Sequence, residues 1–116
     1  MLLDMINRLC VDLYQGDAVT DFRAVYASGV RLVIHKASEG ATIRDPKYAE
    51  RRNAARSASL LLGAYHFGRG GNVDAQIATF LSAASPDAET RLVLDWEVPA
   101  MTTEAARTFL AEVAAK

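Results

Sequence analysis

Short apolar runs recur along the chain at nearly regular intervals, and each is followed by a segment whose apolar positions repeat with the period of a helix. Each run has the length and composition of a β-strand. The run at residues 60–67 is almost entirely apolar, which is typical of a strand covered on both faces of a parallel sheet. The pattern predicts four consecutive βα units, with strands at residues 9–13, 30–37, 60–67 and 92–96.

Start and stop signals mark the first two predicted helices. The first carries Phe22 on its apolar face and ends at Gly29, because glycine readily adopts the left-handed conformation that closes a helix. For the second, Asp45 offers an N-cap carboxylate and Pro46 follows at the first helical position. These signals predict a second helix that starts at this pair and continues to about residue 57.

The third and fourth helices also begin at polar residues. Asn72 or Asp74 starts the third, which ends before Pro86, and Thr102 or Thr103 starts the fourth. Strict alternation of strands and helices implies an α/β fold with a parallel sheet and right-handed crossovers, either an open doubly wound layer or part of a barrel. In both architectures ligands meet the loops at the carboxyl ends of the strands, so functional residues are expected there.

The composition fits one soluble globular domain. The 116 residues are 51% hydrophobic and 23% charged, and they are too few for two domains of ordinary size. A net charge of -1 excludes the broad positive field that binds nucleic acid or an anionic bilayer. The single cysteine, Cys10, cannot form an internal disulfide and has no partner at zinc-ligand spacing, so a disulfide scaffold and a structural zinc site are both excluded.

The hydropathy predicts neither a membrane anchor nor an ordinary leader. No apolar run approaches the ~20 residues of a membrane helix. Asp4 and Arg8 fall where a signal peptide would have to be apolar. We therefore expect no membrane partner, and action outside the cell would need another export route or release by lysis.

The end of the last predicted strand carries two acidic residues. Asp95 and Glu97 are separated by one position, so they point to the same side of the strand. Two carboxyl groups in a partly buried site disfavour each other's ionisation, which tends to leave one as an acid and the other as a base or stabiliser. Cleavage of a glycosidic bond requires this arrangement, although a solvated strand end is the ordinary alternative.

Polar groups also follow the three other predicted strands. Asp12 ends the first, Glu39 follows the second, and Tyr65 and His66 lie near the end of the third. An isolated aspartate after a strand most often caps a loop. Four successive strands that deliver polar groups to one edge favour a shared site instead.

Five stretches in series carry a resemblance to a known family. The chain is similar to family 25 of the glycoside hydrolases, the Chalaropsis-type lysozymes or N-acetylmuramidases of bacteria and phages, which have an irregular β/α barrel and cut bacterial peptidoglycan. Order and spacing match from Cys10 to about Val113. The stretches are VDLYQGD at residues 11–17, VIHKASEG at 33–40, GAYHF at 63–67, DAQ at 74–76 and LDWE at 94–97.

The resemblance implies cleavage of the β-1,4 bond between N-acetylmuramic acid and N-acetylglucosamine, with peptidoglycan strands as the partner and neither cofactor nor metal. It implies that Glu97 is the general acid, that Asp95 orients the acetamido group or stabilises the developing cation, and that Asp12 supports the same rim. The substrate-binding residues that it implies are Tyr65, Glu39 and Tyr14, with Lys36 as the buried ion-pair partner of Glu39.

The chain is short for this fold. A complete barrel needs on the order of 200 residues, so residues 1–116 are expected to form a single partial domain, the N-terminal half of an irregular (β/α) TIM-like barrel. The flanking strands then have unpaired edges that invite pairing. We expect a second copy or another polypeptide to cover these edges; otherwise the chain is an open four-stranded layer without useful activity.

Two other functions stay open. The same half barrel could be a non-catalytic module that binds wall glycan or assembles with another chain. The loop Gly68–Asn72 could hold a phosphate at a helix N-terminus. Its spacing matches no nucleotide-binding motif, and a flexible loop is the simpler interpretation.

Three further features are interpreted as structural. His35 and His66 are expected to be packed rather than titrating. Trp96 is expected to pack under a helix, on the side opposite the acids. Basic residues on the second helix predict a solvated face rather than a site for anionic wall polymers. These basic residues are Arg44, Lys47, Arg51, Arg52 and Arg56.

Overall fold

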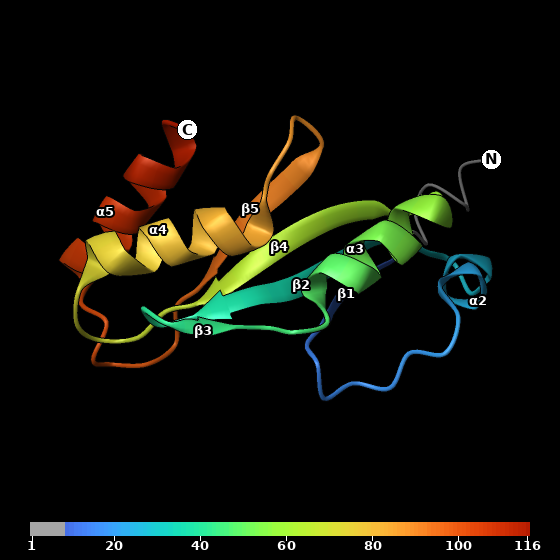
Figure 1. Ribbon diagram of the computed structural model, residues 1–116, viewed down its shortest axis with the longest axis horizontal. Helices are drawn as coiled ribbons and strands as arrows, with labels where there is room; N and C mark the ends of the chain where they lie inside the picture. Colours follow the sequence, from blue (N-terminus) through green and yellow to red (C-terminus); the bar gives the residue numbers. More distant parts are fainter. Residues whose placement is uncertain (1–8) are drawn as a thin grey trace.

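The computed structural model describes residues 9–116 and confirms an α/β fold of alternating strands and helices (Figure 1). Asp4 and Arg8, on which the expected lack of a leader depends, lie outside the described residues. Within them, no helix is both long and apolar enough to cross a bilayer. The strands are β1 (Leu9–Leu13), β2 (Val30–Glu39), β3 (Ile43–Arg44), β4 (Leu61–Phe67) and β5 (Thr90–Asp95), and the helices are α2 (Phe22–Ala27), α3 (Tyr48–Ser57), α4 (Val73–Ala84) and α5 (Thr103–Ala114).

The long strands form one parallel sheet in the order β1-β2-β4-β5. Their register fixes which residues are neighbours at the carboxyl edge: Asp12 lies opposite Ile34, and Phe67 lies opposite Asp95. All the long strands therefore deliver their final residues to the same edge of the sheet. Among the described residues, β1 and β5 are the outer strands.

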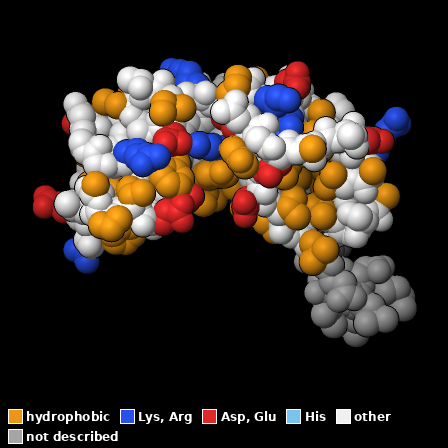
Figure 2. Space-filling view, turned by 90° about the horizontal axis from the view of Figure 1, so that it is seen from below, with side chains coloured by type: hydrophobic (Ala, Val, Ile, Leu, Met, Phe, Trp, Pro, Cys, Tyr) orange, Lys and Arg blue, Asp and Glu red, His pale blue; other side chains and the backbone are white. Residues whose placement is uncertain are grey.

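The two faces of the sheet differ in what covers them. Helices α3, α4 and α5 lie on one side (Figure 1), where Leu62 and Ala64 of β4 are buried with Phe80 and Phe109 of the helices. On the other side Leu61 is 48% exposed and Tyr65 and Phe67 are half-buried, so the expected cover on both faces is incomplete in the described chain. Seen from below, this open side is a hollow with hydrophobic and acidic side chains (Figure 2).

Most predicted boundaries hold to within two residues, and the differences arise where the element contacts another segment of the chain. Strand β2 continues to Glu39 because its end pairs with β3, which is too short to show a periodic pattern. Helix α3 begins at Tyr48 rather than at Pro46. The carboxylate of Asp45 accepts hydrogen bonds from the N–H of Lys47, at 2.9 Å, and from the N–H of Gln15, at 2.8 Å. Asp45 therefore fixes the turn before the helix and ties it to the loop after β1.

The two predicted N-caps with alternatives are resolved by hydrogen bonds. The side chain of Asn72 accepts from the N–H of Ala75 at 3.1 Å and begins α4. The hydroxyl of Thr102 accepts from the N–H of Ala105 at 3.1 Å and begins α5. Each bond satisfies one of the donors that the first turn of a helix leaves free.

Both histidines are structural, as expected. His66 is completely buried between the sheet and the helices, where its ring stacks on Phe109 at 5.0 Å. Its Nε2 donates to the Gln76 side-chain oxygen at 2.9 Å, and its Nδ1 accepts from the Ser38 hydroxyl at 2.7 Å. His35 is equally buried, with Nδ1 against the Lys36 carbonyl at 2.8 Å. Both rings are thus held neutral, and burial lowers the pKa of each.

This burial predicts that the protein loses stability in mildly acidic solution. In the unfolded chain each histidine binds a proton near pH 6.5, whereas in the folded protein the lowered pKa of His35 and of His66 opposes protonation. Lowering the pH from 7.5 to 5.5 should therefore reduce the free energy of unfolding by about 1–2 kcal/mol. Urea unfolding at several pH values between 7.5 and 5.5 measures this change in the free energy of unfolding.

The control for this series is Asp95→Asn. It removes a carboxyl whose raised pKa acts on stability in the opposite direction. In this variant the free energy of unfolding should fall at least as steeply as the pH is lowered from 7.5 to 5.5. A free energy of unfolding that is flat or increases towards pH 5.5 in both proteins would contradict the assignment of two neutral buried rings.

Candidate active site

Three carboxyl groups from two strands line one cavity at the carboxyl edge of the sheet. Asp12 comes from the end of β1, Asp95 ends β5, and Glu97 follows it. The cavity has a volume of about 550 Å³ and lies on the face that the helices leave open. Its remaining wall is formed by Ile34, Tyr65, Val93 and Leu94. The site thus combines acids with an apolar floor and one tyrosine.

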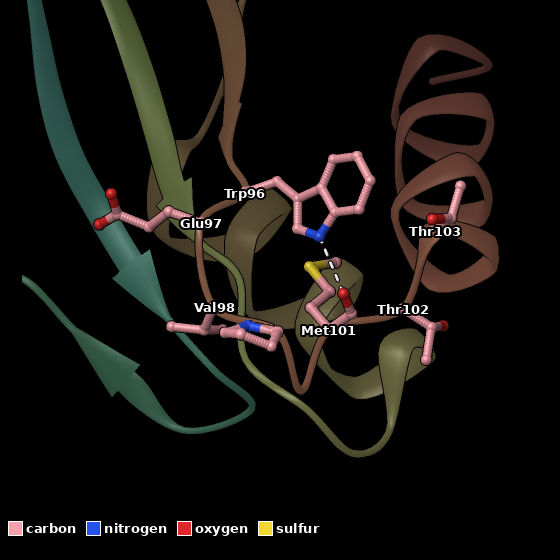
Figure 3. A pocket seen from close by; sticks show the side chains of 7 residues that line it. Trp96, Glu97, Val98, Met101, Thr102 and Thr103 are labelled. Carbon is pink, nitrogen blue, oxygen red and sulfur yellow. Dashed lines mark hydrogen bonds between the residues drawn. The ribbon is translucent and has the colours of Figure 1, made fainter.

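The alternation of side chains after β5 separates Glu97 from Trp96. Figure 3 shows the two side chains pointing to opposite sides of the chain, with Glu97 towards the strands and Trp96 towards α5. The indole N–H donates to the carbonyl of Met101 at 2.8 Å. Trp96 remains 48% exposed, so the expectation that it packs under a helix is wrong. The side chain of Met101, 2% exposed, fills the interior there instead.

Burial and like charges act together on Asp95. Its pKa is raised, first by burial and then by the charges of Glu97 and Asp12. The charge of Lys36 acts in the other direction. Asp95 therefore keeps its proton to a higher pH than an ordinary aspartate does.

Tyr65 contributes a hydroxyl that stays protonated. Burial is the main reason that its pKa rises to about 12, and the negative charges of Asp12 and Asp95 add to the effect. At neutral pH the phenol is therefore a hydrogen-bond donor at the wall of the cavity. A sugar hydroxyl or an acetamido oxygen is a suitable acceptor.

Two residues predicted to bind substrate lie outside this cavity. Glu39 is held by two cations, Lys36 and Arg69, and these hydrogen bonds lower its pKa. Tyr14 follows the end of β1, and its ring lies over Gly16, where an added Cβ would clash with it at 2.4 Å. The structure thus brings together Asp12, Tyr65, Asp95 and Glu97, and it separates the other two from them.

The basic helix is less exposed than expected. Arg51 is 6% exposed and donates to the carbonyls of Tyr14, at 3.0 Å, and Asp17, at 2.7 Å. Arg56 forms a two-pronged pair with Asp87, at 2.7 and 2.9 Å. The prediction of a solvated face is therefore wrong for Arg51. A signal was present in the sequence, because Arg51 lies three residues after the buried Tyr48 and thus on its side of the helix.

The glycine-rich loop is fixed by hydrogen bonds within the protein. The N–H of Gly68 donates to the Asp95 carbonyl at 3.0 Å, and the N–H of Arg69 donates to the Gln76 side chain at 3.1 Å. A phosphate would need such donors to be free. The N–H groups of Gly68 and Arg69 are therefore not available to a phosphate, and this part of the loop is held by the protein. Among residues 9–116, no cluster of three or more histidine, cysteine or acidic side chains is arranged to hold a metal ion.

Parallel βα units with paired acids at the carboxyl edge of the sheet define an α/β domain whose site lies at the ends of its strands. The sequence profile described as Glycosyl hydrolases family 25 matches residues 11–116, and the chain belongs to this family. A curated relative, the autolytic lysozyme of Clostridium acetobutylicum, is 36% identical over 75 residues, which cover 65% of this chain and 23% of that protein.

Solved structures agree with the family assignment. The bacterial lysozyme of Streptomyces coelicolor is 26% identical with a TM-score of 0.74, over 90% of this chain and 54% of that one. The muramidase of Trichobolus zukalii is 27% identical with a TM-score of 0.73, over 88% of this chain and 55% of that one. The chain therefore spans about half the length of these solved relatives and less than a quarter of the curated one.

Proposed function

We propose that this chain is the acid-bearing part of a muramidase that hydrolyses the β-1,4 bond between N-acetylmuramic acid and N-acetylglucosamine in peptidoglycan. The observation that carries the proposal is the cavity shared by Asp12, Asp95 and Glu97 with Tyr65. The names lysozyme and muramidase of the relatives agree with it. Family membership restricts the chemistry to glycosides, and the acids supply the groups that this chemistry needs.

The proposed reaction uses each carboxyl group differently. Glu97 donates a proton to the oxygen of the leaving sugar as the bond from that oxygen to the anomeric carbon breaks. Asp95, in its ionised form, orients the acetamido group or stabilises the positive charge that develops on the sugar. Water then adds its hydroxyl to the anomeric carbon and returns a proton to Glu97. Asp12 adds a third carboxyl group to the edge of the cavity, and the Tyr65 hydroxyl donates a hydrogen bond to the bound sugar.

Clearing of purified cell walls tests this proposal. A suspension of walls should lose turbidity when the purified protein is added, and heat-inactivated protein should have no effect. Walls that stay turbid but retain the protein in a sedimentation assay would support the alternative, a non-catalytic module that binds wall glycan. The length of the chain relative to its solved relatives is the observation that keeps this alternative in view.

We also propose that a second copy or a complementing chain covers the open sheet of this partial barrel domain. Within the described residues, β1 and β5 have no strand on their outer sides, and backbone groups at such edges can pair with another strand. Light scattering coupled to size-exclusion chromatography should give the mass of a dimer or a larger assembly. A monodisperse monomer at high protein concentration would contradict self-association.

A further inference from the structure

Lys36 lies on the same face of the sheet as the acids. It follows Ile34, which lines the cavity, by two positions, and it lies opposite Tyr65 in the register of β2 and β4. Its ammonium is 5.5 Å from the centre of the Phe67 ring. Phe67 in turn is the register partner of Asp95. A positive charge therefore lies beside the carboxyl end of β5.

Glu39 holds Lys36 and is itself held by a second cation. One of its carboxylate oxygens pairs with the ammonium of Lys36. The other accepts two hydrogen bonds from the guanidinium of Arg69, at 3.0 and 2.6 Å. The side chains of Lys36 and Glu39 are only 17% and 15% exposed, whereas that of Arg69 is 52% exposed. The buried part of this cluster is therefore screened less by solvent than a surface ion pair.

Arg69 is aimed at Glu39 by a buried network. The side chain of Gln76 accepts from the Arg69 N–H, at 3.1 Å, and donates to the Arg69 carbonyl, at 2.8 Å. Gln76 is 1% exposed and also bonds to His66. The guanidinium lies 4.9 Å from the centre of the Phe67 ring. The backbone of Arg69 is therefore held by hydrogen bonds on both sides, with its guanidinium between Glu39 and the ring of Phe67.

The charges of this cluster do not cancel. Lys36 and Arg69 carry one positive charge each, and Glu39 carries one negative charge, so the cluster has a net positive charge. Without Arg69, the pair of Lys36 and Glu39 would be neutral. Arg69 therefore leaves the charge of Lys36 available to the neighbouring cavity, although it lies outside that cavity.

We propose that Lys36, held by Glu39 and Arg69, is a positioning residue that supplies a fixed positive charge to the carboxylate cavity and favours the ionised form of Asp95. The groups that oppose it are the carboxylates of Asp12 from β1 and Glu97 after β5. Tyr65 on β4 stays neutral. The direction in which Lys36 shifts the pKa of Asp95 agrees with this role. The catalytic consequence rests on the proposed function, whereas the effect on charge does not.

Titration of the Asp95 carboxyl carbon by NMR tests the inference without any need for activity. In Lys36→Met the midpoint should rise by about one pH unit, because an opposite charge has been removed. In Arg69→Gln the midpoint should rise by less, because Lys36 stays in place and only the net charge of Lys36, Glu39 and Arg69 changes. Lys36→Arg should restore most of the original value, and the exposed control Lys47→Met should leave it unchanged.

The outcomes separate this inference from the proposed hydrolysis. An unchanged midpoint in folded Lys36→Met overturns the inference, whatever the activity. If Lys36→Met does not fold, the titration midpoint of Asp95 in Arg69→Gln tests the inference instead. The side chain of Arg69 is half exposed, so its removal leaves the core intact. A raised midpoint in a protein that does not attack walls supports the inference while the proposed function fails. If the protein is active, the acidic limb of kcat/KM should move upward by the same amount in Lys36→Met.

Discussion

Replacing Glu97 by glutamine is expected to lower the rate of wall lysis by a factor on the order of 10²–10⁴, because the amide keeps the size of the side chain but cannot donate the proton. Glu97 lines the cavity with Asp12 and Asp95, and its side chain points away from Trp96 towards the strands (Figure 3). The amide should leave packing unchanged, so the free energy of unfolding should differ little from that of the parent protein. Initial rates of turbidity loss measure the effect.

Glu112→Gln is the matched control for this variant. Glu112 is an exposed residue of α5, outside the cavity, and the same chemical change there should leave the rate of lysis unaltered. Lysis at the parental rate by Glu97→Gln would refute the assignment of the proton donor. Equal loss in both variants would indicate an effect of charge on wall binding rather than on the reaction.

Arg51→Ala is expected to lower the free energy of unfolding by about 3 kcal/mol, because it removes a buried cation that satisfies backbone carbonyls. The guanidinium bonds to the carbonyls of Tyr14 and Asp17 and contacts Nε2 of His35 at 3.3 Å. Alanine would leave these acceptors without donors and would create a void beside α3. The loop after Asp12 should also loosen, so amide hydrogen exchange at residues 14–17 should become faster.

The neighbouring arginine provides the comparison. Arg52 makes a longer contact with Asp87, at 3.5 Å, and its Nε has no hydrogen-bond partner. Arg52→Ala should therefore cost less than about 1 kcal/mol. Urea unfolding of both variants checks the difference. Equal costs would mean that the buried hydrogen bonds of Arg51 contribute little to the stability of the fold.

Local signals in the sequence were sufficient for most of the fold. The N-caps at Asn72 and Thr102 act within one turn, so the residues that specify them are close in sequence. Helix α3 begins at Tyr48, two residues after the predicted start, and Asp45 bonds both to Lys47 and to Gln15, which is 30 positions away in the sequence. Strand β3 was missed because two residues carry no period. Contacts with other segments decide such features, and the periodic pattern of one segment does not contain them.

The site, too, was predictable in part from the sequence. The rule that parallel strands end at one edge predicted that Asp12 and Asp95 would meet, and the cavity contains both. The rule does not say which acids are neutralised by partners. Glu39 pairs with Arg69, whose backbone in the loop between β4 and α4 is bonded to the side chain of Gln76. The resemblance implied Glu39 as a substrate-binding residue and Lys36 as its partner; the structure contains the pair with Lys36 and adds Arg69, which no local pattern indicated.

Analysis of the new reducing ends tests the central claim most directly. Peptidoglycan digested with the purified protein is reduced with borohydride, hydrolysed in acid and separated, so that each new chain end is identified by its amino sugar alcohol. Cleavage at the proposed bond should yield reduced muramic acid, and the yield should fall with Glu97→Gln. Reduced glucosamine in its place, or no new reducing ends from walls that bind the protein, would contradict muramidase activity at the cavity of Asp12, Asp95 and Glu97.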